Sequence, residues 1–276
     1  MIKLETKSIE ARTIAVMGGT YGNVPALRAA LADAEKVGCD TFAFIGDSIG
    51  CCGHSDEIVE LIRTSFSTLV AGNHEQQAAA GELTCGCGYS SPEDERISCL
   101  AFAYANQSLS ETQREWLGTW PDLVLLHVGD HSLLLVHGSP NETSEFIYES
   151  EVRDEQIGEW LAKYKVEGIV GTHTGLTWHR ELPNAGWMAN CGAIGKPDHD
   201  GDTAVHYGIV KVAENGLRFQ LRRVEYNHLD WTTQLEAEGV DEIFISPLRT
   251  GIWTCGLESL PEWERNVRGK KDILAE

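Results

Sequence analysis

The sequence contains no apolar run long enough to cross a membrane, and residues 1–7 lack the continuous apolar stretch of a signal peptide. We therefore expect a cytoplasmic protein without a membrane partner. Positive charge is also scarce, since 22 lysines and arginines face 42 aspartates and glutamates, for a formal net charge of −20. An acidic surface repels nucleic acid, so we expect none as a partner. A bound metal cation could still attract a small anionic substrate.

Short β-rich runs and helical patterns alternate along the first part of the chain. Strands are predicted over residues 12–17, 41–45 and 68–71, with helices from residue 24 and over residues 58–66. This alternation is a βαβ rhythm, which is typical of a layered α/β fold. Later strands are predicted over residues 123–128, 132–136, 168–171, 205–212 and 217–224, and helices over 111–116 and 151–164. No internal repeat is apparent.

Four of the predicted strands end in residue types that bind metals. Asp47 follows the second strand, Asn73 and His74 follow the third, and two later strands end in His137 and in His173. An open α/β sheet brings such strand ends together at its carboxyl edge, where ligands bind. Carboxylate, amide oxygen and imidazole suit a hard or borderline divalent ion. We expect this ion to be iron, manganese or zinc. Its predicted ligands are Asp47, Asn73, His137 and His173.

Cysteine pairs of the Cys-x-x-Cys type, which build common structural zinc sites, are absent. Because we expect a reducing compartment, we predict free thiols rather than disulfides. Five cysteines lie in loops near the expected ligand-binding edge: Cys51, Cys52, Cys85, Cys87 and Cys191. For these we favour buried or substrate-lining thiols over a cysteine metal site.

The order of these motifs resembles that of the calcineurin-like metallophosphoesterases over about residues 12–213. The matching stretches are Gly46-Asp47, Gly72-Asn73-His74-Glu75, His137-Gly138, Thr172-His173 and the segment from Asn190 to Gly195. The resemblance implies a four-layer αββα sandwich of two mixed β-sheets flanked by helices. We expect residues 1–225 to form this domain and residues 226–276 to be a C-terminal extension packed on it.

Three positions depart from the family pattern, and all three belong to one of the family's two metals. Gly19 and Tyr21 stand where the family has an aspartate and a histidine, and Gly175 replaces the second histidine of the last motif. The residues that match the ligands of the other metal are all present. This one-sided loss implies a single ion per chain, or a second ion held by other groups.

Further roles follow from the resemblance and from position in the sequence. His74 matches the family's substrate-facing histidine, which implies that it protonates the leaving group or holds a phosphate oxygen. Tyr21 is either a phenol that faces substrate or an aromatic plug in the vacated volume. His54 is a candidate substitute ligand, although a residue beside the ligands is the favoured interpretation. The stretch from Trp253 to Cys255 could fold over the cleft.

We therefore predict a metal-dependent hydrolase of a small-molecule phosphomonoester or phosphodiester, with His74 and Tyr21 as catalytic residues. One alternative is a non-catalytic protein that binds a metal and an anion in the same pocket. The other is an enzyme that uses one redox-capable ion for different chemistry. A homo-oligomer is compatible with the sequence.

Overall fold

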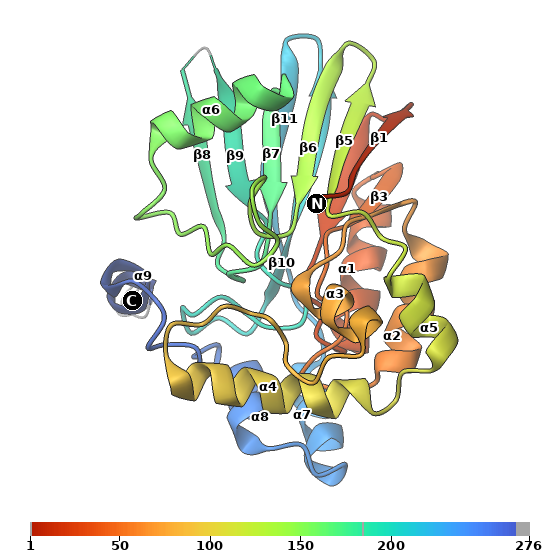
Figure 1. The fold of residues 1–276 in the computed structure, drawn as a ribbon, viewed down its shortest axis with the longest axis vertical. Coiled ribbons are helices and arrows are strands. Elements are labelled where there is room, and N and C mark those ends of the chain that lie inside the picture. Colours follow the sequence, from red (N-terminus) through yellow and green to blue (C-terminus); the bar gives the residue numbers. More distant parts are fainter. Residues whose placement is uncertain (1, 184, 269–276) are drawn as a thin grey trace.

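The fold, seen in a computed structural model that describes residues 2–183 and 185–268, is built on two mixed β-sheets (Figure 1). The first sheet has the order β1-β5-β6-β7-β9-β8, with β1 Leu4–Ile9, β5 Leu123–Val128, β6 His131–Val136, β7 Gly168–Gly171, β9 Gly186–Asn190 and β8 Trp178–Leu182. The second has the order β11-β10-β2-β3-β4, with β11 Gly216–Val224, β10 Val205–Ala213, β2 Thr13–Met17, β3 Thr41–Phe44 and β4 Thr68–Leu69. Each sheet combines parallel and antiparallel pairs.

Helices flank the two sheets. They are α1 Val24–Lys36, α2 Ser55–Ser65, α3 Asn73–Ala80, α4 Pro92–Asn106, α5 Glu111–Leu117, α6 Asp154–Tyr164, α7 His228–Ala237, α8 Glu242–Thr250 and α9 Glu262–Arg268. Within the described part of the chain, no helix combines the length and the apolar character needed to span a membrane.

Alternate residues of each strand face opposite sides of its sheet, and this alternation builds the layers. In β2, Ile14 and Val16 join the cluster between the two sheets, whereas Ala15 and Met17 join the cluster that also contains residues of α1 and α2. On the other sheet, Leu134 of β6 packs with residues of α6. Two sheets that pack face to face, each covered by helices on its outer face, form the predicted αββα sandwich.

Three strands, β1, β8 and β9, are not predicted from the sequence pattern. β1 and β8 lie at the two edges of the first sheet, and β9 joins β8 to β7. β1 alternates between exposed and half-buried residues, and β8 carries the polar run His179-Arg180-Glu181 in its centre. An edge strand that faces solvent needs little apolar sequence, so the hydrophobic patterns of β1 and β8 are too weak for prediction. β9 is internal and mostly buried, and this explanation does not apply to it.

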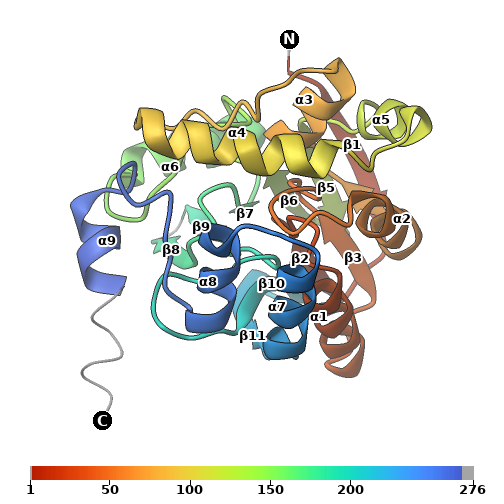
Figure 2. The same cartoon turned by 90° about the horizontal axis from the view of Figure 1, so that it is seen from below.

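The C-terminal segment packs on the end of the sandwich. α4 lies on one side of this end, and α7 and α8 lie on the other (Figure 2). Trp231 of α7 packs in one cluster with Cys52, and Trp253 packs in another with Leu176. The Trp253 indole N–H also donates to the carbonyl of Pro197 at 2.7 Å. These contacts fix the segment beside the ends of β3 and β7.

Candidate metal centre

Two glycines let the ends of β3 and β4 approach each other closely. A Cβ atom at Gly46 would lie 2.3 Å from the backbone nitrogen of Gly72, and one at Gly72 would lie 2.4 Å from Asp47 Oδ1. Asp47 itself has a φ of 60°, which is the left-handed region that non-glycine residues rarely occupy. The Gly-Asp and Gly-Asn-His motifs are therefore needed to place the Asp47 carboxylate against the start of α3.

A second buried carboxylate, Glu75, fixes this arrangement. Its oxygens accept hydrogen bonds from the backbone N–H groups of Asp47 (2.8 Å), Ser48 (2.7 Å) and Gly72 (2.8 Å), and from the Ser48 hydroxyl (2.6 Å). Four donors on one fully buried carboxylate tie the loop after β3 to the first turn of α3 and stabilise the unusual backbone at Asp47. Sequence reasoning placed Glu75 in a motif but gave it no role.

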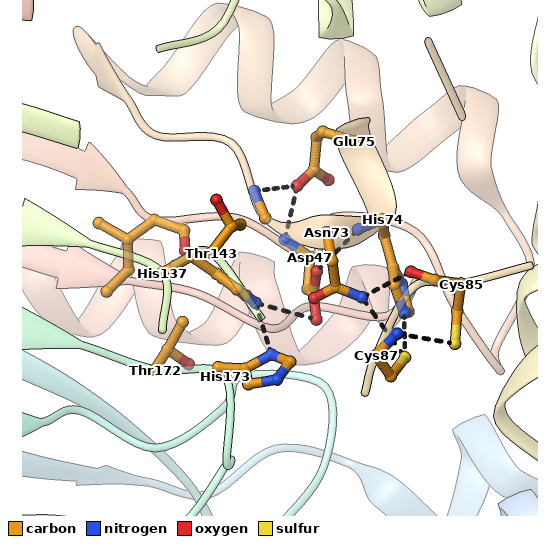
Figure 3. Close-up of polar contacts among 12 residues, drawn as sticks. Asp47, Asn73, His74, Glu75, Cys85, Cys87, His137, Thr143, Thr172 and His173 are labelled. Carbon is orange, nitrogen blue, oxygen red and sulfur yellow. Dashed lines mark hydrogen bonds and ion pairs between the residues drawn. The ribbon is translucent and has the colours of Figure 1, made fainter. Parts of the chain in front are cut away.

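Two histidines complete the cluster around Asp47 (Figure 3). His137 Nδ1 lies 2.7 Å from the carbonyl of Ile45, which can only accept, so Nδ1 carries the proton and Nε2 is the atom that faces the cluster. That Nε2 lies 3.3 Å from Asp47 Oδ2 and 3.1 Å from His173 Nδ1. The ligand atoms of Asp47, His137 and His173 all lie within 4.8 Å of one another, and all three residues are buried.

The charges in the cluster favour a cation. Burial raises the pKa of Asp47, but the His137 and His74 imidazoles outweigh burial and hold that pKa below its ordinary value. Burial, together with repulsion from His137, lowers the pKa of His173 to about 3. Asp47 is thus an anion and His173 a neutral imidazole, which are the protonation states that metal ligands require. Burial lowers the pKa of His137, but the Asp47 charge outweighs burial and raises it, so an ion at this site would displace a proton from His137. A divalent ion would supply positive charge that balances the Asp47 carboxylate.

Asn73 offers a fourth ligand atom to the same cluster. Its side-chain nitrogen donates to the carbonyl of Cys85 at 2.8 Å, which leaves Oδ1 on the other side of the amide. This Oδ1 is buried and has no hydrogen-bond partner among residues 2–183 and 185–268. A buried unpaired acceptor is costly in the absence of a ligand. The four residues predicted from the strand ends therefore fit a divalent ion.

Tyr21 fills the space beside Gly19, one of the positions that depart from the family pattern. A Cβ atom at Gly19 would lie 3.3 Å from the Tyr21 hydroxyl oxygen, so Tyr21 occupies the space beside this glycine. The Tyr21 ring centre lies 6.0 Å from that of His74. Burial and the Asp47 charge raise the pKa of Tyr21 well above its ordinary value, so the phenol keeps its proton and can donate. Tyr21 both fills the volume and lines the cavity next to Asp47.

His54 lies in a different environment. Its Nε2 atom is 2.8 Å from Glu238 Oε2, and its ring packs 5.0 Å from the Trp231 ring centre. His54 therefore contacts the C-terminal segment, and it does not belong to the ligand cluster around Asp47. Of the two interpretations left open by the sequence, the structure places His54 outside the ligand set.

A cavity opens from the metal centre, and its far wall comes from the C-terminal segment. Asp47, His74 and His173 line one end. Side chains of the segment after residue 240 that line it are Ile243, Phe244, Pro247, Leu248, Trp253 and Cys255. The stretch from Trp253 to Cys255 thus does reach the cleft. The sequence could not determine this position, because the contact joins parts of the chain that are far apart in sequence.

Lys196 supplies a positive charge in this acidic protein at the cavity wall. Its ammonium nitrogen lies 3.5 Å from the centre of the Trp253 ring, a cation–π contact that fixes the side chain. Burial lowers the pKa of Lys196 below its ordinary value. Sequence reasoning missed this residue, although it directly follows the recognised segment from Asn190 to Gly195.

All eight cysteines are free thiols, as predicted. Cys52, Cys85, Cys87 and Cys191 are buried, and Cys51 is half-buried. Cys51, Cys87 and Cys255 also line the cavity. Most of these thiols therefore lie where the sequence analysis placed them.

The geometry agrees with comparisons to known proteins. A sequence model described as calcineurin-like phosphoesterase matches residues 12–206. An uncharacterized protein of Methanocaldococcus jannaschii is 24% identical over 225 residues, which cover 78% of this chain and 88% of that protein.

Two solved structures share the fold. A metallophosphoesterase from Sphaerobacter thermophilus is 24% identical with a TM-score of 0.67, and the match covers 88% of this chain and 100% of that one. A hypothetical protein from Pyrococcus horikoshii OT3 is 18% identical with a TM-score of 0.71, and the match covers 88% of this chain and 99% of that one. At these identities the likeness concerns the fold alone.

Proposed function

The chain belongs to the calcineurin-like phosphoesterase family, and from this premise we propose that it is a metal-dependent hydrolase of a small-molecule phosphomonoester or phosphodiester. The family implies a divalent ion, and the cluster of Asp47, His137 and His173 is the observation that carries the proposal. Together with Asn73 these residues would hold one ion of iron, manganese or zinc. When bound, such an ion polarises a phosphoryl oxygen and lowers the pKa of a water molecule.

In this proposal His74 delivers a proton to the oxygen that leaves. Its Nδ1 lies 2.7 Å from the carbonyl of Ile49, which orients the ring, and its Nε2 lies 3.5 Å from the Cys87 sulfur. Both His74 and Cys87 line the cavity. The backbone N–H of His74 also donates to Asp47 Oδ1 at 3.3 Å, so the ring is held close to the metal centre. A general acid in such a position contributes typically about 10²–10⁴-fold to the rate.

Tyr21 and Lys196 would bind the anionic part of the substrate. The protonated phenol of Tyr21 lines the same cavity as Asp47 and His74 and can donate to a phosphate oxygen. Lys196 adds a positive charge on the cavity wall, held by the Trp253 ring. The apolar side chains of α8 leave room beside these groups for the uncharged part of a small molecule.

Replacing Lys196 with methionine is expected to raise KM for a phosphoester by about 10–100-fold, because a hydrogen bond to a charged group contributes about 1.5–3 kcal/mol. kcat should change less, since Lys196 is not placed at the leaving group. Steady-state kinetics measures both constants.

The matched control is Lys163→Met. Lys163 also lies over an aromatic ring, that of Tyr164 at 5.0 Å, but it is on α6 and outside the cavity. An equal rise in KM for both variants would mean that Lys196 does not bind substrate.

The proposal is tested by metal-dependent turnover. Chelator-treated protein should hydrolyse no phosphoester from a panel of monoesters and diesters, and addition of Mn²⁺, Fe²⁺ or Zn²⁺ should restore turnover of at least one compound. Turnover that persists after chelation would contradict a metal-dependent reaction. Loaded protein that binds a phosphoester tightly and turns none over would instead identify the non-catalytic alternative.

A further inference from the structure

A second group of possible metal ligands lies beside the first and contains two sulfurs. The ligand atoms of His74, Cys85 and Cys87 all lie within 4.8 Å of one another, and the three residues are buried (Figure 3). The Cys87 sulfur is 3.5 Å from His74 Nε2. The residues come from α3 and from the loop between α3 and α4, and none of them belongs to the cluster of Asp47, His137 and His173.

The local backbone directs both sulfurs to one side. Gly86 separates the two cysteines and has a φ of 62°, a left-handed conformation that favours glycine. A Cβ atom at Gly86 would also lie 2.6 Å from the side chain of Gln77. The Cys-Gly-Cys sequence therefore forms a tight turn in which the backbone N–H of Cys87 reaches the Cys85 sulfur at 3.3 Å.

Neighbouring groups prepare these three atoms for a cation. The N–H of Cys87 donates to the Cys85 sulfur, and the side-chain amide of Asn73 donates to the Cys87 sulfur at 3.4 Å. Donors aimed at sulfur stabilise the thiolate, which is the form that binds metals. Hydrogen bonds from Cys87 and His74 lower the pKa of Cys85, whereas burial raises the pKa of Cys87, so an ion would have to displace the Cys87 proton. His74 is oriented by the carbonyl of Ile49 through Nδ1, the arrangement that commonly supports a metal-binding imidazole.

We propose that His74, Cys85 and Cys87 form a second metal site, which takes a thiophilic divalent ion such as Zn²⁺. Two thiolates and one imidazole select softer ions than the carboxylate, amide and imidazoles of the first site. Binding would displace protons from the Cys87 sulfur and from His74 Nε2, and release them to solvent. Because His74 and Cys87 line the cavity, a fourth coordination position would face it.

An ion at the second site and the proposed hydrolysis would compete for His74. If the proposed hydrolysis uses Nε2 of His74 as a proton donor, an ion on that atom removes the donor. The regulatory part of this inference rests on the proposed function. Zn²⁺ at the sulfur site inhibits the reaction that Mn²⁺ at the first site supports.

Cadmium titration tests the site without reference to catalysis. Chain preloaded with Mn²⁺ should bind one equivalent of Cd²⁺ and develop the ultraviolet charge-transfer absorption of cadmium thiolates. Cys85→Ser and Cys87→Ser should lose this absorption and weaken Cd²⁺ binding by at least about 100-fold, more than outer-shell substitutions usually do. Undiminished absorption in both variants would overturn the proposal.

Cys99→Ser is the matched control, because Cys99 forms another candidate group with Cys85 and Glu95. The absorption should survive in Cys99→Ser, and its loss there would place the ion in that other group. Asp47→Asn should also keep the absorption, since Asp47 belongs to the first site only. Loss of the band in Asp47→Asn would show that the sulfurs are not an independent site.

X-ray absorption of zinc-loaded wild-type protein tests the proposal even if a cysteine variant fails to fold. When the first site is preloaded with Mn²⁺ and one equivalent of Zn²⁺ is added, the expected zinc spectrum has two sulfur neighbours at about 2.3 Å and one imidazole nitrogen at about 2.0–2.1 Å. A shell of nitrogen and oxygen alone would contradict it.

Activity then separates this inference from the proposed function. Thiolate coordination without hydrolysis of any phosphoester leaves the site standing and rejects the proposed function. In an active protein, Zn²⁺ inhibition that is equally strong in Cys87→Ser rejects the regulatory role.

Discussion

Replacing Asp47 with asparagine is expected to abolish metal binding at the first site and, with it, metal-dependent turnover. Asp47 provides the carboxylate of the cluster, with Oδ2 3.3 Å from His137 Nε2. Asparagine keeps the shape of the side chain but removes the charge that attracts a divalent ion. We expect affinity for Mn²⁺ to fall by more than about 100-fold, a larger loss than for outer-shell substitutions. Calorimetric titration with Mn²⁺ and a turnover assay measure the two effects.

The control for this substitution is Asp154→Asn. Asp154 is an exposed residue at the start of α6, where it pairs with Arg180 at 3.3 Å. Its replacement should leave Mn²⁺ affinity and turnover unchanged, because exposed ion pairs contribute about 0–1 kcal/mol. The account is contradicted if Asp47→Asn binds Mn²⁺ as tightly as Asp154→Asn does.

Replacing His74 with alanine is expected to lower turnover by about 10²–10⁴-fold while the ion of the first site stays bound. The hydrogen bond from residue 74 to Asp47 comes from the backbone N–H, so alanine preserves it. Only the imidazole is removed, and with it the proton that would pass to the leaving group. Turnover and bound Mn²⁺ per chain should be measured on the same samples.

The matched variant is His127→Ala on β5. His127 is half-buried and its Nδ1 contacts the Ser132 hydroxyl at 2.9 Å, away from the cavity. It should keep full turnover. If His74→Ala is as active as His127→Ala, His74 serves the fold rather than the reaction. If Mn²⁺ is lost together with turnover, His74 supports the metal centre and its catalytic role is not established.

The strand ends could be predicted because local sequence determines them. Gly46 and Gly72 allow a close approach of two loops that no larger residue permits, so glycine marks these positions in the sequence. The apolar runs before Asp47, His137 and His173 are buried strands with a clear pattern. The sequence therefore indicated which side chains come together, and the structure brings Asp47, His137 and His173 within 4.8 Å.

Contacts made across the fold could not be predicted in the same way. Lys196 gains its position from Trp253, which lies in a segment that the family resemblance does not cover. The grouping of Cys85 and Cys87 with His74 depends on how the loop after α3 folds back on that helix. The sequence showed that these residues exist, but not that Lys196, Trp253, His74 and Cys87 line one cavity.

The most direct test of the central claim, a metal centre at the ends of β3, β4, β6 and β7, is anomalous diffraction from crystals grown with Mn²⁺. The account predicts an anomalous peak bounded by Asp47 Oδ2, Asn73 Oδ1, His137 Nε2 and His173 Nδ1. Absence of a peak there at saturating Mn²⁺, or a peak at other residues only, would contradict the claim.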